Sequence, residues 1–178
     1  AIISVFIGES LTKVLAELEG VTTGKLSPEE KTDLKLNVVG KIPDLMLDNT
    51  DRNRTSPFAF TGNKFEFRAV GSSANCSNAM TTLNAIVAKQ LRDFKVAVDT
   101  LIDEKGMKKD DAIFNVLREY IKQSKNILFE GDGYSEAWEQ EAAKRGLSNY
   151  KTTPEALKAR ASKQALDLFA ELGIMNHI

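Results

Sequence analysis

Apolar residues recur at the spacing of an α-helix through most of the chain that follows Asn75. One stripe covers residues 83–101 and is expected to end near Gly106, and a second covers residues 112–121. Because residues three or four apart lie on one side of a helix, each stripe predicts an amphipathic helix whose apolar side faces a core. The part of the chain that follows Asn75 is therefore expected to be helical.

Two further helices are predicted downstream. A turn with the sequence Glu-Gly-Asp-Gly at residues 130–133 precedes a short helix around Trp138. Thr153 and Pro154 are typical of a helix start, with Thr as the N-cap and Pro at the first helical position. This last helix is expected to run to Gly173 without interruption.

The first 75 residues have a mixed pattern. Apolar residues between Ile3 and Leu18 predict a helix that ends at Gly20, and residues 34–38 alternate as in a short strand. Residues 42–48 are ambiguous, and residues 48–57 have the composition of a loop. Residues 58–60 and 64–70, separated by a Gly-Asn turn signal, predict a hairpin. We therefore expect an α+β fold, with a small antiparallel β region in residues 1–75 and a helical region in residues 76–178, both within a single partial domain.

Composition excludes several classes of partner. The 24 Lys and Arg residues nearly balance the 25 Asp and Glu residues, so the formal net charge of −1 gives no support for nucleic acid or an acidic membrane as a partner. The lone cysteine, Cys76, rules out an internal disulfide and suits a reducing cytoplasm. No apolar run reaches the roughly 18 residues of a membrane span, and no signal peptide is visible.

The segment with the most chemical information is NRTSPFAFTGNKFEFR, residues 53–68. Side chains alternate between the faces of a strand, so Lys64, Glu66 and Arg68 share one face and the aromatic residues 65 and 67 share the other, where they can anchor the strand in a core. Two cations with a carboxylate between them suit phosphoryl transfer from a nucleotide, which requires positive charge around the transferred group and an oxygen ligand for a metal. A solvated strand face with cross-strand ion pairs has the same pattern, and the pattern alone does not identify an enzyme.

The same segment, followed by AVGSSAN, resembles the signature region of the type III glutamine synthetases. AIISVFIGESLTKVL, LMLDNTDRNRTSPF, ILFEGDGYSEAW and AAKRGLSNYKTTPEAL are also similar to segments of that family, so the resemblance covers essentially all 178 residues. It implies an enzyme that joins ammonia to L-glutamate through γ-glutamyl phosphate, with ATP as co-substrate and Mg²⁺ or Mn²⁺ as cofactor. It also implies a homo-oligomeric ring assembly, while composition predicts a cytoplasmic protein with no nucleic-acid or membrane partner.

The resemblance also implies roles for single residues. Arg54 matches the arginine of an Asn-Arg-Ser/Thr loop beside the transferring phosphoryl group and the glutamate side chain. Glu66 matches a ligand of the metal that bridges the nucleotide phosphates, and Arg68 matches a residue that binds the substrate carboxylate or the transferred phosphoryl group. Lys64 stands where the commoner types carry arginine, so the positive charge is kept and the guanidinium fork is lost.

Other ligands of the family's metal site have no counterpart here, so we interpret the chain as a fragment and expect it to be inactive alone. Two alternatives stay open: a structural or oligomerisation module of the synthetase, and a ligase for an amine other than ammonia. His177 is interpreted as incidental, Cys76 as structural and Ser72-Ser73 as a turn or helix cap, because no partner residues for other roles are evident.

Overall fold

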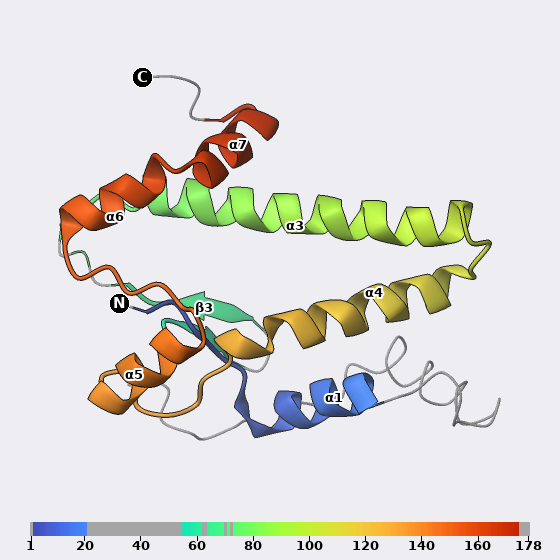
Figure 1. The fold of residues 1–178 in the computed structure, drawn as a ribbon, viewed down its shortest axis with the longest axis horizontal. Helices are drawn as coiled ribbons and strands as arrows, with labels where there is room; N and C mark the ends of the chain where they lie inside the picture. The colour runs from blue at the N-terminus through green and yellow to red at the C-terminus, as the bar shows by residue number, and fades with distance from the viewer. Residues whose placement is uncertain (1, 21–54, 62–63, 70, 72, 175–178) are drawn as a thin grey trace. The chain divides into compact units, whose positions relative to one another are not determined.

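A computed structural model of the 178-residue chain describes residues 2–20, 55–61, 64–69, 71 and 73–174 (Figure 1). The strands are β1 (Val5–Phe6), β2 (Phe58–Phe60) and β3 (Phe65–Phe67). The helices are α1 (Gly8–Gly20), α3 (Ser77–Asp103), α4 (Lys109–Ser124), the 3₁₀ turn η2 (Lys125–Ile127), α5 (Glu136–Lys144), α6 (Thr153–Arg160) and α7 (Lys163–Glu171). A small sheet with helices that follow it confirms the predicted α+β class.

The sheet contains the predicted hairpin and one additional strand. Strands β2 and β3 pair antiparallel, with Ala59 opposite Glu66, as expected from the turn signal between them. Strand β1 pairs with β2 in the parallel sense, with Val5 opposite Phe58, and so the strand order is β1-β2-β3. On its other side, Val5 forms a bridge with Leu128 directly after η2. Segments distant in sequence therefore meet at β1.

The N-terminal residues differ from the sequence prediction. The helix expected from Ile3 onward begins only at Gly8, and Val5–Phe6 is a strand instead. Gly8 has a φ of 78°, which lies in the left-handed region. A right-handed helix that began at Ile3 could therefore not continue through Gly8. The two apolar residues before this break, Phe6 and Ile7, are buried, which explains why they fit a helical stripe as well as a strand.

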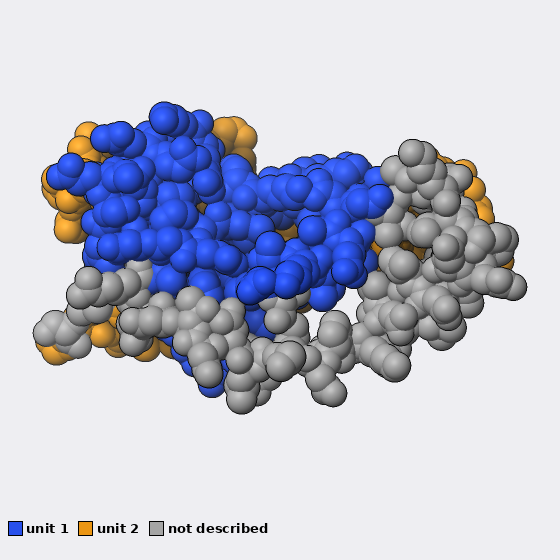
Figure 2. All heavy atoms as spheres, turned by 90° about the horizontal axis from the view of Figure 1, so that it is seen from below, with its two compact units in different colours: residues 1–68, 117–149 blue, residues 69–116, 150–178 orange. Residues whose placement is uncertain are grey.

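The described chain divides into two compact units, which Figure 2 distinguishes by colour. The first consists of residues 1–68 and 117–149, and the second of residues 69–116 and 150–178. In the first unit, Trp138 stacks on Phe129 with ring centroids 3.7 Å apart and packs with buried Ile2 and Ala142. A single partial domain over residues 1–178, with a β-containing segment to residue 75 and a helical segment after it, stays a prediction.

In the second unit, α7 lies beside α3 (Figure 1). Glu171 of α7 pairs with Lys89 at 3.2 Å and with Arg92 at 3.4 Å, both on α3. The apolar stripe of α3 is only partly core, contrary to expectation: Val98 is buried, whereas Leu91 is 65% exposed. Sequence periodicity identifies the apolar side of a helix, but whether another element covers that side depends on tertiary packing.

The helix expected from Thr153 to Gly173 is also interrupted. It is divided into α6 and α7, because the Ser162 side chain accepts a hydrogen bond from the backbone N–H of Ala165 and so caps a new helix. The N-cap of α6 is Thr152, one residue before the predicted Thr153, and its N–H donates to Glu155 at 3.2 Å. The predicted helices over residues 83–101, 112–121 and around Trp138 are confirmed by α3, α4 and α5.

Some predictions fall on residues that the structure does not describe. The strand predicted for residues 34–38, the ambiguous residues 42–48 and most of the loop before the hairpin lie outside the described ranges. In the part of the chain that is described, no helix combines the length and the apolar character required to cross a bilayer.

Candidate active-site strand

The hairpin fixes the strand that carries the predicted charges. At its turn end, the backbone N–H of Thr61 donates to the carbonyl of Lys64 at 2.8 Å. At its open end, the backbone N–H of Arg68 donates to the carbonyl of Pro57 at 2.7 Å. Between these two contacts, three consecutive residue pairs set the register of β3 on β2, and Ala59 opposite Glu66 is the middle pair.

The structure brings three of the predicted site residues together. The carboxylate of Glu66 lies between the other two charges, 3.6 Å from Lys64 Nζ and 3.3 Å from Arg68 Nη2. The exposed fraction of the side chains falls along the strand, from 65% at Lys64 through 40% at Glu66 to 31% at Arg68. The shared strand face predicted from alternation is therefore confirmed, and the deeper end of this face is the arginine.

These ion pairs are suited to exchange of partners. Partly exposed pairs of this kind contribute about 0–1 kcal/mol to folding, because water competes with each contact. Glu66 can thus turn an oxygen from a cation to a metal at little cost in stability. A guanidinium of this kind binds a phosphoryl or carboxylate group in a bidentate manner.

The opposite face of the hairpin is an aromatic cluster formed by Phe58, Phe60, Phe65 and Phe67. Phe58 lies 5.4 Å from Phe65 and 5.9 Å from Phe67, measured between ring centroids. The prediction that this face anchors the strand in a core is wrong for the described residues, because Phe65 remains 47% and Phe67 42% exposed. The buried position of the hairpin is instead Ala59, which is opposite Glu66.

A complete metal site is absent from the described residues. No group of three or more His, Cys, Asp or Glu side chains that could hold a metal ion occurs among them. Glu66 fits a metal as a single ligand, because its carboxylate oxygens are the hard donors that Mg²⁺ prefers. Mg²⁺ in nucleotide-dependent enzymes is commonly bound by one or two carboxylates together with substrate phosphates, so one such ligand on this strand is consistent with a shared site.

The remaining predicted site residue, Arg54, lies outside the described residues, as does His177, which we interpret as incidental. Cys76 is exposed, with its Sγ 3.6 Å from Met80 Sδ. The loop at residues 130–133 is a turn before α5, as predicted, in which an Asp132 carboxylate oxygen accepts the backbone N–H of Tyr134 at 3.0 Å.

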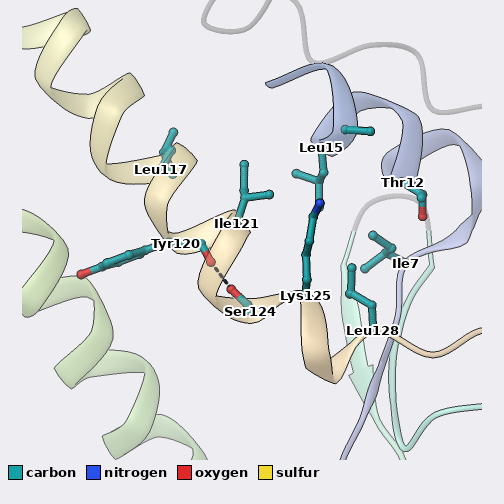
Figure 3. A pocket seen from close by; sticks show the side chains of 10 residues that line it. Ile7, Thr12, Leu15, Leu117, Tyr120, Ile121, Ser124, Lys125 and Leu128 are labelled. Carbon is teal, nitrogen blue, oxygen red and sulfur yellow. Dashed lines mark hydrogen bonds between the residues drawn. The ribbon is translucent and has the colours of Figure 1, made fainter. Parts of the chain in front are cut away.

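A separate apolar pocket of about 310 Å³ lies between α1 and α4 in the first unit (Figure 3). Leu15, Ile121 and Leu128 are among the residues that line it, and Lys125 at its side is paired with Glu19. None of Lys64, Glu66 and Arg68 lines it, so this pocket is distinct from the charged strand face.

Sequence reasoning did not single out Ser4 and Ser56, which are the buried polar residues of the described chain. Ser4 Oγ donates to Ser56 Oγ at 2.8 Å, and Ser56 Oγ donates to the carbonyl of Phe129 at 2.9 Å. One signal was present in the sequence, because Ser4 interrupts an otherwise apolar run over residues 1–7. Its partner 52 positions later could not be found from local patterns.

Comparison with known proteins gives consistent matches. Residues 112–178 match the sequence model of the glutamine synthetase C-terminal domain. A glutamine synthetase of Bacteroides fragilis (strain YCH46) is 57% identical over 166 residues, which cover 93% of this chain and 22% of that protein. A type-3 glutamine synthetase of Dictyostelium discoideum is 40% identical over 178 residues, covering 100% of this chain and 24% of that protein.

A third relative, a glutamine synthetase of Butyrivibrio fibrisolvens, is 34% identical over 174 residues, covering 98% of this chain and 24% of that protein. The chain therefore spans about a quarter of the length of the curated relatives it matches. The match to the Dictyostelium protein includes the charged strand, which lies outside the residues matched by the domain model. On these similarities, the chain is a relative of the glutamine synthetases along nearly its whole length.

Proposed function

We propose that this chain supplies one side of the active site of a type III glutamine synthetase. The enzyme would join ammonia to L-glutamate with ATP and release glutamine, ADP and phosphate. The observation that carries the proposal is the position of Glu66 between Lys64 and Arg68 on one strand face, in a chain related to glutamine synthetases over nearly its whole length. The type III assignment is supported by the Dictyostelium relative, which aligns with all 178 residues.

The proposed reaction has two steps. The γ-carboxylate of glutamate attacks the terminal phosphorus of ATP, and the bond from that phosphorus to the bridging oxygen breaks to give γ-glutamyl phosphate and ADP. Ammonia then attacks the acyl carbon, phosphate leaves, and a proton is lost from nitrogen. Both steps move negative charge near the transferred group, so fixed cations stabilise their transition states.

Each residue of the strand has a role that its surroundings support. Arg68, the least exposed of the three charges, holds the carboxylate or the transferred phosphoryl group through its guanidinium. Lys64, the most exposed, adds positive charge toward the nucleotide. Glu66 supplies one oxygen ligand to Mg²⁺ or Mn²⁺, which when bound neutralises phosphate charge. Arg54 is proposed as a further cation at the transferred group.

The test uses the full-length protein with ATP, glutamate, ammonium and Mg²⁺, and follows phosphate release with each substrate omitted in turn. We expect release to require both glutamate and ammonium, and to fall at least about a hundredfold in Glu66→Gln and in Arg68→Ala. Matched controls are Asp167→Asn and Arg92→Ala, which remove exposed ion-pair partners on α7 and α3. Release that is independent of glutamate, or equal in site variants and controls, refutes the proposal.

We also propose that residues 1–178 alone are inactive, because one carboxylate is insufficient for the metal and the described residues hold no cluster that completes the site. Glutamine formation by the isolated chain would contradict this. Ammonia is the proposed amine because the relatives are named glutamine synthetases, and a competition assay with methylamine tests that choice. The cytoplasm is the proposed compartment, since the one cysteine is a free thiol.

The second candidate is a structural or oligomerisation module. It is favoured by exposed apolar side chains on α3, where Met80 is 56% and Leu91 65% exposed. In a homo-oligomeric ring, such a surface would be covered by a neighbouring subunit or by the rest of the chain. Under this candidate, Leu91→Lys changes the oligomeric mass in light scattering while Glu66→Gln leaves turnover intact.

A further inference from the structure

Two buried hydroxyl groups connect three separate segments of the first unit. Ser4 is 1% exposed and Ser56 is 2% exposed. Ser4 Oγ donates to Ser56 Oγ at 2.8 Å, and Ser56 Oγ donates to the backbone carbonyl of Phe129 at 2.9 Å. Because both hydroxyls are removed from water, loss of the Ser56 hydroxyl leaves the buried Ser4 hydroxyl without its acceptor, and loss of the Ser4 hydroxyl removes the donor to Ser56.

The backbone around the two serines is paired as well. The N–H of Phe58 donates to the carbonyl of Ser4 at 3.3 Å, and the N–H of Phe129 donates to the carbonyl of Val5 at 3.0 Å. The chain entering β2 is thus bound to the start of β1 and, through the Ser56 side chain, to the segment after η2. Through its one hydroxyl, Ser56 contacts both the Ser4 side chain and the Phe129 carbonyl.

Ser56 is one residue from the contact that holds Arg68. The carbonyl of Pro57 accepts the backbone N–H of Arg68 at 2.7 Å. The ring of Pro57 fixes its own φ, so few torsions separate the Ser56 backbone from that carbonyl. A displacement of Ser56 is therefore transmitted to the backbone of Arg68, and through it to the guanidinium beside Glu66.

We propose that Ser56, held by Ser4, is a positioning residue that sets the place of Arg68 in the active site. The inference rests on the proposed function of the charged strand. Ser56 is not proposed as a catalytic residue, because its hydroxyl is buried and engaged by the Ser4 hydroxyl and the Phe129 carbonyl. A misplacement of a substrate-binding group by about 1 Å is enough to slow an enzyme about a hundredfold, so this buried contact controls turnover.

A double-mutant cycle in the full-length enzyme separates positioning from simple stabilisation. We measure kcat/KM for glutamate with radiolabelled glutamate, so that slow turnover is detected, and Tm in parallel. Ser56→Ala is expected to lower kcat/KM about tenfold or more at a temperature where the protein is folded. In the Arg68→Ala background, the same substitution is expected to lower Tm as before and to leave the residual kcat/KM unchanged.

The matched control is Ser135→Ala, which removes another serine hydroxyl from the same unit. Ser135 accepts the backbone N–H of Trp138 at 3.2 Å as the N-cap of α5. Its loss is expected to lower Tm without changing kcat/KM. If Ser56→Ala yields no folded enzyme, the cycle is run with Ser4→Ala, which removes only the donor to Ser56 and is expected to lower kcat/KM about threefold.

The outcomes distinguish the two claims. A normal kcat/KM in Arg68→Ala overturns the proposed function of the strand and the inference with it. A loss in Arg68→Ala with normal kcat/KM in folded Ser56→Ala, or in Ser4→Ala where the former does not fold, overturns the inference alone. An equal fold loss from the serine substitution in both backgrounds also overturns it, since Ser56 would then act independently of Arg68.

Discussion

The guanidinium of Arg68 and the carboxylate of Glu66 lie 3.3 Å apart, two residues along one strand and on one face of it. Their backbones are held by β2, since Glu66 is opposite Ala59 and the N–H of Arg68 donates to Pro57. The hairpin therefore sets the separation of the two backbones independently of the ion pair, while the partly exposed side chains can change partner. Small changes of geometry or charge at Glu66 or Arg68 can therefore test the role of each side chain.

Arg68→Lys keeps the positive charge and removes the planar fork. A lysine binds phosphate or carboxylate as a point charge, without bidentate geometry. In the full-length enzyme we expect kcat/KM for glutamate to fall about ten- to a hundredfold, with Tm changed little because the ion pair is partly exposed. A kcat/KM equal to that of the wild type would show that only charge matters at this position.

Glu66→Asp keeps the carboxylate and withdraws it by one methylene. Because Mg²⁺ requires near-ideal ligand distances, the apparent dissociation constant for Mg²⁺ in the activity assay is expected to rise at least about tenfold. Saturating Mg²⁺ should restore part of the rate. Glu155→Asp, on the first turn of α6, is the matched control and is expected to leave the Mg²⁺ dependence unchanged.

Gly131→Ala tests the packing beneath the loop before α5. A Cβ at this position would lie 2.8 Å from Cζ of Phe129, whose ring is stacked on Trp138. We expect a loss of about 1–3 kcal/mol in unfolding free energy and a change in the fluorescence of Trp138, the only tryptophan of this chain. Protection of the α5 amides from hydrogen exchange should fall in parallel.

The control for that substitution is Gly20→Ala, because a Cβ at Gly20 meets nothing within 4 Å. Its effect should be neutral or stabilising by less than about 1 kcal/mol, since alanine is the better helix former. Equal destabilisation by the two substitutions would indicate that backbone freedom, and not the Phe129 ring, decides the result.

Arg145→Gln tests an electrostatic contact of α5. The hydrogen bond from Arg145 to Glu141, 2.7 Å long, lowers the pKa of that carboxyl below its ordinary value of 4.5, and the positive charge of Arg145 adds to the effect. A carboxyl with a depressed pKa in the folded state stabilises the fold above its unfolded-state pKa, and this contribution is lost as the pH falls through the folded-state pKa. Wild type should therefore exceed the variant in Tm at pH 7.

The same Tm difference should narrow as the pH falls below 4.5, without vanishing. Arg145 also donates to the carbonyl of Leu128 at 2.9 Å and lies 5.4 Å from the centre of the Trp138 ring, and neither contact depends on Glu141. A difference that stays constant with pH would mean that these two contacts account for the whole effect.

Local patterns in the sequence predicted the α+β class, the helices α3, α4 and α5, the hairpin, and the shared face of Lys64, Glu66 and Arg68. These features follow from periodicity and turn signals over a few residues, and the family followed from segments that resemble glutamine synthetases. Local patterns of this kind are readable because the residues that decide them are neighbours in the chain.

Features that join distant segments depend instead on how the chain packs in three dimensions. A two-residue strand such as Val5–Phe6 has no periodic signal and exists because it pairs with β2 more than fifty residues away and with Leu128. The exposure of Phe65 and Leu91 likewise depends on whether another element covers them. The hydrogen bonds of Ser4 and Ser56 could not be foreseen for the same physical reason: burial and pairing are set by chain closure over long distances, which no local pattern specifies.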